Sequence, residues 1–123
     1  AELKMELPEH PLTVFADPKI LGGILNNIIL NGIQSVVNGK AIIDVKLVKK
    51  GHKALVSISD NGVGISDALK EKVFTPYFST KKTGSGIGLA VAKKGIEHAG
   101  GNIWFETTVG LGTTFHISLP VSS

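Results

Sequence analysis

The order in which helical and β-hairpin patterns follow one another constrains the fold of this chain most strongly. Residues 41–50 alternate apolar and polar side chains, and residues 53–60 return after a two-residue turn at Gly51–His52, which predicts a β-hairpin. Residues 102–108 and 112–120 predict a second hairpin near the end of the chain. One helical pattern precedes the first hairpin and two more lie between the hairpins, so we expect a sheet with helices on one face.

The longest helical pattern runs over residues 18–37 and is apolar nearly all round, which is typical of a buried helix. Asp17 is its expected N-cap, Pro18 suits its first position, and Asn38–Gly39 is expected to end it. The other predicted elements are two short strands around a Pro-containing loop in residues 3–17, a helix over 67–74 capped by Ser66 or Asp67, a loop over 75–86, and a helix over 87–99. The order of elements predicts an α+β (or α/β) two-layer sandwich, with residues 1–123 as a single domain.

Composition narrows the possible functions. The chain has 123 residues with a hydrophobic fraction of 42% and a charged fraction of 19%, which fits one globular domain. It contains no cysteine, which excludes disulfides and thiolate metal sites. The net charge is +3, but all 13 basic residues are lysine, so the bidentate contacts that arginine makes to bases are unavailable. We therefore expect no nucleic-acid partner, and no apolar run is long enough to span a membrane.

Three carboxamides interrupt the apolar surface of the first helix. Asn27, Asn31 and Gln34 are spaced four and three residues apart, so they share one helix face. One interpretation is a partly exposed polar face. The other is a stripe that faces a ligand, since carboxamide oxygens can ligate a hard cation such as Mg²⁺ and the amide groups can donate to phosphate.

The stretch "DNGVGI" at residues 60–65 ends a predicted strand on a carboxylate. A turn at Asn61–Gly62 is one interpretation of it. In the other, Asp60 lies at the mouth of a pocket as an acceptor that no protein donor satisfies, and it accepts from an amine such as the exocyclic amino group of a purine. Gly62 and Gly64 would then let the backbone approach a flat ring closely.

A glycine-rich loop leads into the last predicted helix. Gly84, Gly86 and Gly88 could present backbone N–H groups and the positive end of a helix dipole to an anion. Lys81 and Lys82 are adjacent and could meet phosphate charge, although solvation is the simpler interpretation of a lysine pair. The loop matches neither a Walker A motif nor the dinucleotide fingerprint.

Taken together, these segments resemble the catalytic and ATP-binding domain of sensor histidine kinases, in the superfamily shared with gyrase B, Hsp90 and MutL. "NNIILNGIQSV" is similar to the N box, "DNGVGI" to the G1 box, "VFTPYFSTK" to the F box and "GSGIGLAVAKKGIEHAGG" to the G2 box. "GNIWFETTVGLGTTFHISLPV" is similar to the closing hairpin of the family. The resemblance implies a Bergerat-type ATP-binding fold: a mixed sheet of about five strands with three helices on one face.

The resemblance also implies roles for individual residues. Asn31 would ligate Mg²⁺ with Asn27 beside it, and Gln34 stands where many relatives carry a Lys or Arg directed to the phosphates. Asp60 would accept from the adenine amino group, and Thr113 would contact adenine directly or through a water. The implied ATP-binding set is Asn27, Asn31, Gln34, Asp60, Gly62, Gly64, Ile65, Phe78, Thr80, Lys81, Lys82, Gly84, Ser85, Gly86, Ile87, Gly88, Leu89 and Thr113. Phe78 and residues 79–84 would form a short lid.

By the same resemblance, the domain binds ATP or ADP with Mg²⁺ and donates the γ-phosphoryl group to a histidine. None of His10, His52, His98 and His116 lies on the expected phosphoacceptor helix, so that histidine would belong to a separate dimerisation domain. A response regulator receiver domain would take the phosphoryl group next. We expect an isolated domain that is monomeric, a homodimeric parent protein and a cytoplasmic location, and the sequence leaves open whether the parent is bound to a membrane.

Three alternatives stay open within the same superfamily. One is an ATPase that acts as a conformational clamp, although those relatives carry a glutamate base where Asn27 stands. The second is a Ser/Thr kinase of the anti-sigma-factor type. The third is a nucleotide-binding regulator without catalytic activity.

Overall fold

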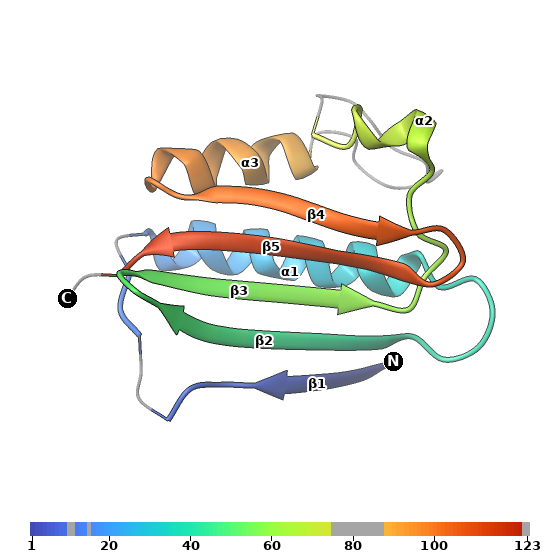
Figure 1. The fold of residues 1–123 in the computed structure, drawn as a ribbon, viewed down its shortest axis with the longest axis horizontal. Helices are drawn as coiled ribbons and strands as arrows, with labels where there is room; N and C mark the ends of the chain where they lie inside the picture. The colour runs from blue at the N-terminus through green and yellow to red at the C-terminus, as the bar shows by residue number, and fades with distance from the viewer. Residues whose placement is uncertain (10–11, 15, 75–87, 122–123) are drawn as a thin grey trace.

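In the computed structural model, residues 1–9, 12–14, 16–74 and 88–121 are described. Figure 1 shows one sheet with two long helices running along it. The strands are β1 (Glu2–Glu6), β2 (Ile42–Lys50), β3 (Lys53–Asp60), β4 (Asn102–Thr108) and β5 (Gly112–Pro120), and the helices are α1 (Pro18–Gln34), α2 (Asp67–Lys70) and α3 (Gly88–His98).

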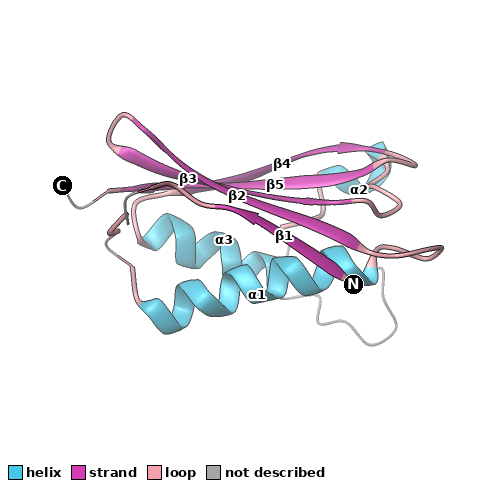
Figure 2. Ribbon diagram, turned by 90° about the horizontal axis from the view of Figure 1, so that it is seen from below, coloured by secondary structure: helices cyan, strands magenta, loops and turns pink. Residues whose placement is uncertain are grey.

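The sheet has five strands in the order β1-β2-β3-β5-β4. β1 runs parallel to β2, and the other neighbouring strands are antiparallel. Figure 2 shows α1 and α3 side by side on one face of this sheet, and Figure 1 shows α2 beyond the β4 edge. Within the described part of the chain no helix covers the opposite face, which we call the helix-free face. The predicted mixed sheet of about five strands with three helices is therefore confirmed. The two hairpins also form as predicted, and β3, β4 and β5 have the predicted bounds.

The core lies between the sheet and the α1–α3 layer. α1 contributes Ile24 and Ile28, which are buried, and α3 contributes Ile96. Alternate residues of the strands face these helices, among them Ile58 and Phe115. Because the α1–α3 layer covers only one face of the sheet, the buried apolar residues of the strands, such as Ile43, Ile58 and Phe115, fall on that face, whereas Trp104 lies on the opposite face and is 40% exposed.

Several predicted elements are shorter than expected, and β2 and α3 differ from their predicted bounds by no more than one residue at either end. The helix predicted over residues 18–37 ends at Gln34, because Ser35 caps it and the Ser35 carbonyl accepts from the Val63 amide, a partner outside the helix. The helix predicted over 67–74 covers only Asp67–Lys70.

Phe74, expected at the end of that helix, instead packs its ring against those of Phe105 and Phe115, with centroids 5.8 and 6.3 Å away. The two strands predicted in residues 3–17 reduce to β1, because among the described residues of that segment Val14 makes just an isolated bridge, to Val121.

The start of α1 follows the sequence signals. Asp17 Oδ1 accepts from the amides of Lys19 and Ile20 at 2.8 and 3.4 Å, and Pro18 occupies the first turn. Within the described part of the chain, no helix is long and apolar enough to cross a membrane.

Candidate functional site

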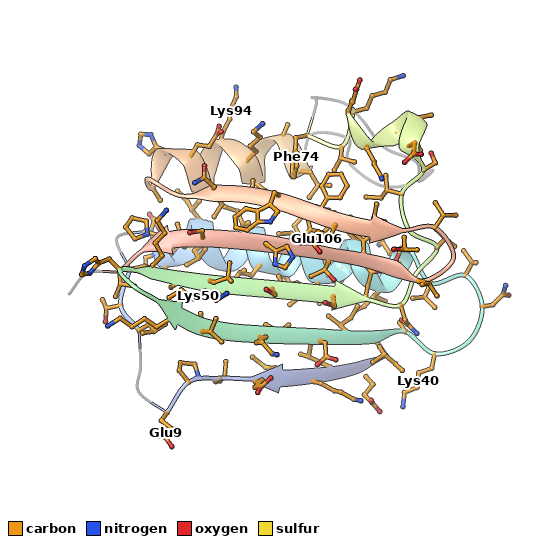
Figure 3. All side chains as sticks on the ribbon, in the orientation of Figure 1. Glu9, Lys40, Lys50, Phe74, Lys94 and Glu106 are labelled. Atoms are coloured by element: carbon orange, nitrogen blue, oxygen red, sulfur yellow. The ribbon has the colours of Figure 1, made fainter. Side chains whose placement is uncertain are left out.

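Among the described residues, the predicted site residues of α1, of the 60–65 segment and of β5 lie at one end of the sheet, at the end of β3 and near the end of α1. In Figure 3 this end is marked by Lys40, whereas Lys50 lies toward the opposite end of β2. The strand alternation that turns Ile58 and Phe115 toward the core also turns Asp60 and Thr113 to that side. The apolar core thus gives way to polar side chains at the end of the sheet.

The Asp60 carboxylate is held by protein donors. Its Oδ1 accepts from the amides of Gly62 at 2.9 Å and Thr113 at 3.2 Å, and from the Ser35 hydroxyl at 3.3 Å. The expectation of an acceptor that no protein donor satisfies is therefore wrong. Backbone and side-chain donors from three segments instead fix the direction of this carboxylate before any ligand arrives.

Ser35 joins the end of α1 to Asp60. Its hydroxyl lies 2.7 Å from the Gly32 carbonyl as well as 3.3 Å from Asp60 Oδ1. Gly32 is buried, and a Cβ built on it would lie 3.1 Å from Asp60 Cβ. The last turn of α1 and the end of β3 are therefore in close contact, which brings the carboxamide stripe next to the carboxylate.

Gly62 and Gly64 are required by contacts within the protein. A Cβ on Gly62 would overlap the Ser35 hydroxyl, and a Cβ on Gly64 would lie 2.6 Å from the Thr108 carbonyl oxygen. Gly64 also has φ = 78°, a conformation that favours glycine. The sequence interpretation assigned these glycines to clearance for a ring, whereas their Cβ positions face protein atoms. Their predicted position at the border of a base stays a prediction.

Asn61 fastens the same loop to the start of β2. Its Oδ1 accepts from the Ile42 amide at 2.8 Å, and its Nδ2 donates to the Lys40 carbonyl at 2.9 Å. The turn interpretation gave Asn61 only a local role. The structure instead makes it a bridge between two strand ends, beside Asp60.

A pair of threonines closes the other side of the site. Thr107 Oγ1 lies 2.8 Å from the Ile65 amide, 2.8 Å from Thr113 Oγ1 and 3.1 Å from the Gly112 carbonyl oxygen. Thr113 is buried, with 6% of its surface exposed. The 61–65 segment is thus bonded to the β4–β5 hairpin through this hydroxyl group and through the Gly110 amide, which donates to the Val63 carbonyl at 2.9 Å. Sequence reasoning missed Thr107, although it continues the inward-facing positions of Ile103 and Phe105.

The carboxamide stripe lies on α1 as predicted from its spacing. Asn27 and Asn31 are half-buried and one turn apart, and Gln34 is exposed at the end of the helix. Among the described residues, no group of three or more His, Cys, Asp or Glu side chains could hold a metal ion. Asn31 is adjacent to Gly32, which contacts Asp60, and its amide oxygen is a ligand type that hard cations accept.

The remaining predicted site residues fall on α3 or outside the described part of the chain. Leu89 is half-buried in the first turn of α3 and packs against the core, and Gly88 begins the helix. Eight predicted residues lie in the segment 75–87, outside the described residues: Phe78, Thr80, Lys81, Lys82, Gly84, Ser85, Gly86 and Ile87.

A separate pocket of about 180 Å³ lies at the other end of α1. Its lining is mostly apolar and comes from the start of α1 and the end of α3, with Ile20, Ile24 and Ile96 among its residues. The Asp17 carboxylate in it already caps α1. This pocket lacks the converging polar groups that Asp60 gathers at the opposite end of the helix.

Three of the four histidines, which the sequence places outside a phosphoacceptor helix, fall on described residues. His52 and His98 are exposed. His116 lies on the helix-free face of the sheet, where its Nδ1 is 2.9 Å from the Ser57 hydroxyl and its ring stacks on Trp104. Its Nε2 is buried and 3.5 Å from the exposed Glu106 carboxylate, too far for a good hydrogen bond.

Comparison with known proteins places this geometry among related domains. The family described as "Histidine kinase-, DNA gyrase B-, and HSP90-like ATPase" matches residues 16–123. Sporulation kinase B of Bacillus subtilis (strain 168) is 38% identical over 112 residues, which are 91% of this chain and 26% of that protein. Sensor histidine kinase ZraS of Escherichia coli (strain K12) is 39% identical over 116 residues, or 94% of this chain and 24% of that protein.

Solved structures agree with the sequence comparisons. The catalytic domain of histidine kinase ThkA, in a nucleotide-free form, superimposes with a TM-score of 0.84 at 32% identity, covering 97% of this chain and 78% of that one. The mycobacterial sensor histidine kinase MprB gives a TM-score of 0.86 at 26% identity, covering 98% and 83% of the two chains. The chain spans about a quarter of the length of the two curated relatives described above.

Proposed function

Because the chain belongs to the histidine kinase-, DNA gyrase B- and HSP90-like ATPase family, we propose that it is the ATP-binding catalytic domain of a sensor histidine kinase. In this proposal it donates the γ-phosphoryl group of ATP to a histidine on a separate dimerisation domain. A response regulator receiver domain then takes the phosphoryl group. The similarity of nearly the whole chain to sensor kinases supports this choice within the family.

The observation that carries the proposal is the fixed carboxylate of Asp60. Three donors converge on its Oδ1, so the carboxylate is oriented without help from a ligand. A carboxylate is an acceptor only, and the exocyclic amino group of adenine is a donor, so the pair recognises the base. Thr113 stands beside it, with its amide on the same carboxylate and its hydroxyl within the site.

The carboxamide stripe of α1 lies on the side of the site where the phosphates would bind. Asn31, with Asn27 one turn away, would hold Mg²⁺ through its amide oxygen, and the ion would offset the charge of the phosphates when bound. Phosphoryl transfer depends mainly on placement and charge stabilisation. The chain's own residues therefore bind and orient the nucleotide, and the accepting histidine comes from outside it.

The amide side chains of α1 also argue against water activation by this helix. Asn27 is half-buried at the position where the clamp ATPases of the superfamily carry a glutamate base. A neutral carboxamide cannot accept a proton from water as a carboxylate does. Transfer to another protein group is therefore favoured over hydrolysis.

Calorimetric titration of ATP with Mg²⁺ into Asp60→Asn tests the base-recognition step. An amide NH₂ cannot accept from adenine, so we expect binding to weaken by more than about tenfold, the effect of a lost hydrogen bond to a charged group. Asp44→Asn is the matched control, since Asp44 is exposed on β2. Equal ATP affinity in both variants would contradict the proposal.

Phosphotransfer needs its own experiment. The chain is incubated with labelled ATP, Mg²⁺ and a dimerisation domain from the same parent protein. We expect label on the dimerisation domain that is lost in acid and kept in base, as for phosphohistidine. Base-labile, acid-stable label would favour a Ser/Thr kinase, and release of phosphate without labelled protein would favour an ATPase.

A further inference from the structure

We propose that Thr107 is a positioning residue for nucleotide recognition, which sets the direction of the Thr113 hydroxyl and holds the 61–65 segment against the β4–β5 hairpin. This inference rests on the proposed function, because it concerns the same adenine site. Thr107 itself does not need to contact the nucleotide. It acts through Thr113 and Ile65.

Three polar partners converge on the Thr107 hydroxyl. Thr107 Oγ1 lies 2.8 Å from the Ile65 nitrogen, 2.8 Å from Thr113 Oγ1 and 3.1 Å from the Gly112 oxygen. These partners belong to the loop after β3 and to the first two residues of β5. The Thr107 side chain therefore joins Ile65 to the strand that carries Thr113, in addition to Asp60, which accepts from Gly62 and Thr113, and to the backbone bond from Gly110 to Val63.

The single proton of the Thr107 hydroxyl limits which of these partners it can donate to. A threonine hydroxyl donates one proton and accepts through its lone pairs. The Ile65 amide can only donate, so Thr107 accepts there and has one proton for either Gly112 or Thr113. If the proton goes to Gly112, Thr113 must donate back to Thr107. If it goes to Thr113, the Thr113 proton is released for another acceptor.

The choice between these two arrangements matters for the base. Adenine presents acceptor ring nitrogens beside its amino donor, so an oxygen that donates beside Asp60 complements it. Hypoxanthine presents the opposite pattern, an oxo acceptor beside an N–H donor. The arrangement in which Thr107 donates to Thr113 is the one that suits adenine, whether Thr113 acts directly or through a water.

Thr113 connects Asp60, which would accept from the base, to Thr107. The Thr113 amide donates to Asp60 Oδ1 at 3.2 Å, while its hydroxyl is bonded to Thr107 at 2.8 Å. Thr113 is 6% exposed, so its hydroxyl has little freedom to find another direction. Loss of the Thr107 hydroxyl would therefore leave Thr113 and the Ile65 amide without this partner.

The test is the binding of ADP and of inosine diphosphate to Thr107→Val, which keeps the branched shape and removes the hydroxyl. We expect ADP binding to weaken by about three- to tenfold, the usual effect of one lost neutral hydrogen bond. Inosine diphosphate should change less, so the preference for ADP falls. Contacts with the ribose and phosphates are common to both ligands and cancel in this ratio.

Two further variants separate positioning from stability. Thr107→Ser keeps the hydroxyl and should retain the preference for ADP. Thr114→Val is the matched control, because Thr114 makes a hydroxyl bond of the same 2.8 Å length to Ser59 on the helix-free face of the hairpin. It should lower the midpoint of thermal unfolding without changing the preference.

The inference is overturned if Thr107→Val loses stability as Thr114→Val does and keeps the preference for ADP. If Thr107→Val does not fold, Thr113→Val gives the second reading, and an unchanged preference there overturns the inference as well. A wild-type protein that prefers ADP shows that the proposed function survives such a result. A wild-type protein that binds neither nucleotide ends both proposals.

Discussion

Replacement of Gly62 by alanine should cost this domain a large part of its stability. Gly62 is buried, and its φ is not in the left-handed region, so the cost is steric rather than conformational. An added Cβ would overlap the Ser35 hydroxyl and lie 2.6 Å from Ser35 Cβ and 2.9 Å from its carbonyl carbon. The Ser35 hydroxyl can rotate away, but the backbone of Ser35 forms the C-cap of α1 and cannot move without disturbing the end of the helix.

The expected magnitude follows from these contacts. Insertion of a methyl group into a packed site usually costs about 1–3 kcal/mol. Here the blocking atoms include backbone, so we expect the upper end of that range, about 3 kcal/mol. For a domain of this size such a loss lowers the midpoint of thermal unfolding by roughly 10–20 °C.

The stability of Gly62→Ala is measured by urea and thermal unfolding, and two other glycines provide comparisons in these assays. Gly22 lies in α1 with nothing within 4 Å of an added Cβ, so Gly22→Ala should stabilise the domain by about 0.5–1 kcal/mol. Gly39 also has open space but φ = 83°, so Gly39→Ala should cost about 1–2 kcal/mol through the backbone alone.

A double variant tests the assignment of the clash to Ser35. Ser35→Gly removes two of the three closest contacts, so it should recover at least about 1 kcal/mol of the loss in Gly62→Ala. Additive losses in the double variant, or a Gly62→Ala protein as stable as wild type, would refute the reasoning.

Three smaller effects follow from individual contacts. Asn61→Ala removes two hydrogen bonds at the start of β2, so the free energy of unfolding in urea should fall by about 1–3 kcal/mol, and an unchanged midpoint would contradict the bridge. Asp17→Ala removes the α1 cap and should cost about 1 kcal/mol in the same assay, whereas Asp44→Ala should not. A hydrogen bond and the charge of Lys70 lower the pKa of Asp67 below its usual 3.8, so NMR titration of Lys70→Ala should show that pKa rising. Because the folded pKa is the lower one, the stabilisation exists above pH 3.8 and disappears as pH falls through the folded pKa.

The hairpins could be predicted from the sequence because their signals are local. Alternation and a two-residue turn define β2 and β3, and the prediction for β3 matches Lys53–Asp60. The end of α1 was predicted three residues too late because its cause is not local. The Ser35 carbonyl accepts from the amide of Val63, a residue of the loop after β3, and no pattern within residues 18–37 contains that contact.

The candidate site was predictable where a residue type implied a chemical role. Asp60 and the asparagines stand out because polar groups at such positions need partners. Thr107 and Ser35 do not stand out, since hydroxyl residues at strand and helix ends are common in any fold. Their roles depend on pairing across the fold, Thr107 opposite Thr113 and Ser35 against Asp60.

The most direct test of the central claim is an amide NMR titration of the domain with ADP and Mg²⁺. We predict the largest shifts at Gly62, Ile65 and Thr113, whose amides donate to Asp60 or to Thr107. Shifts confined to Ile20 and Ile96 in the apolar pocket, or no shifts at saturating ADP, would contradict it.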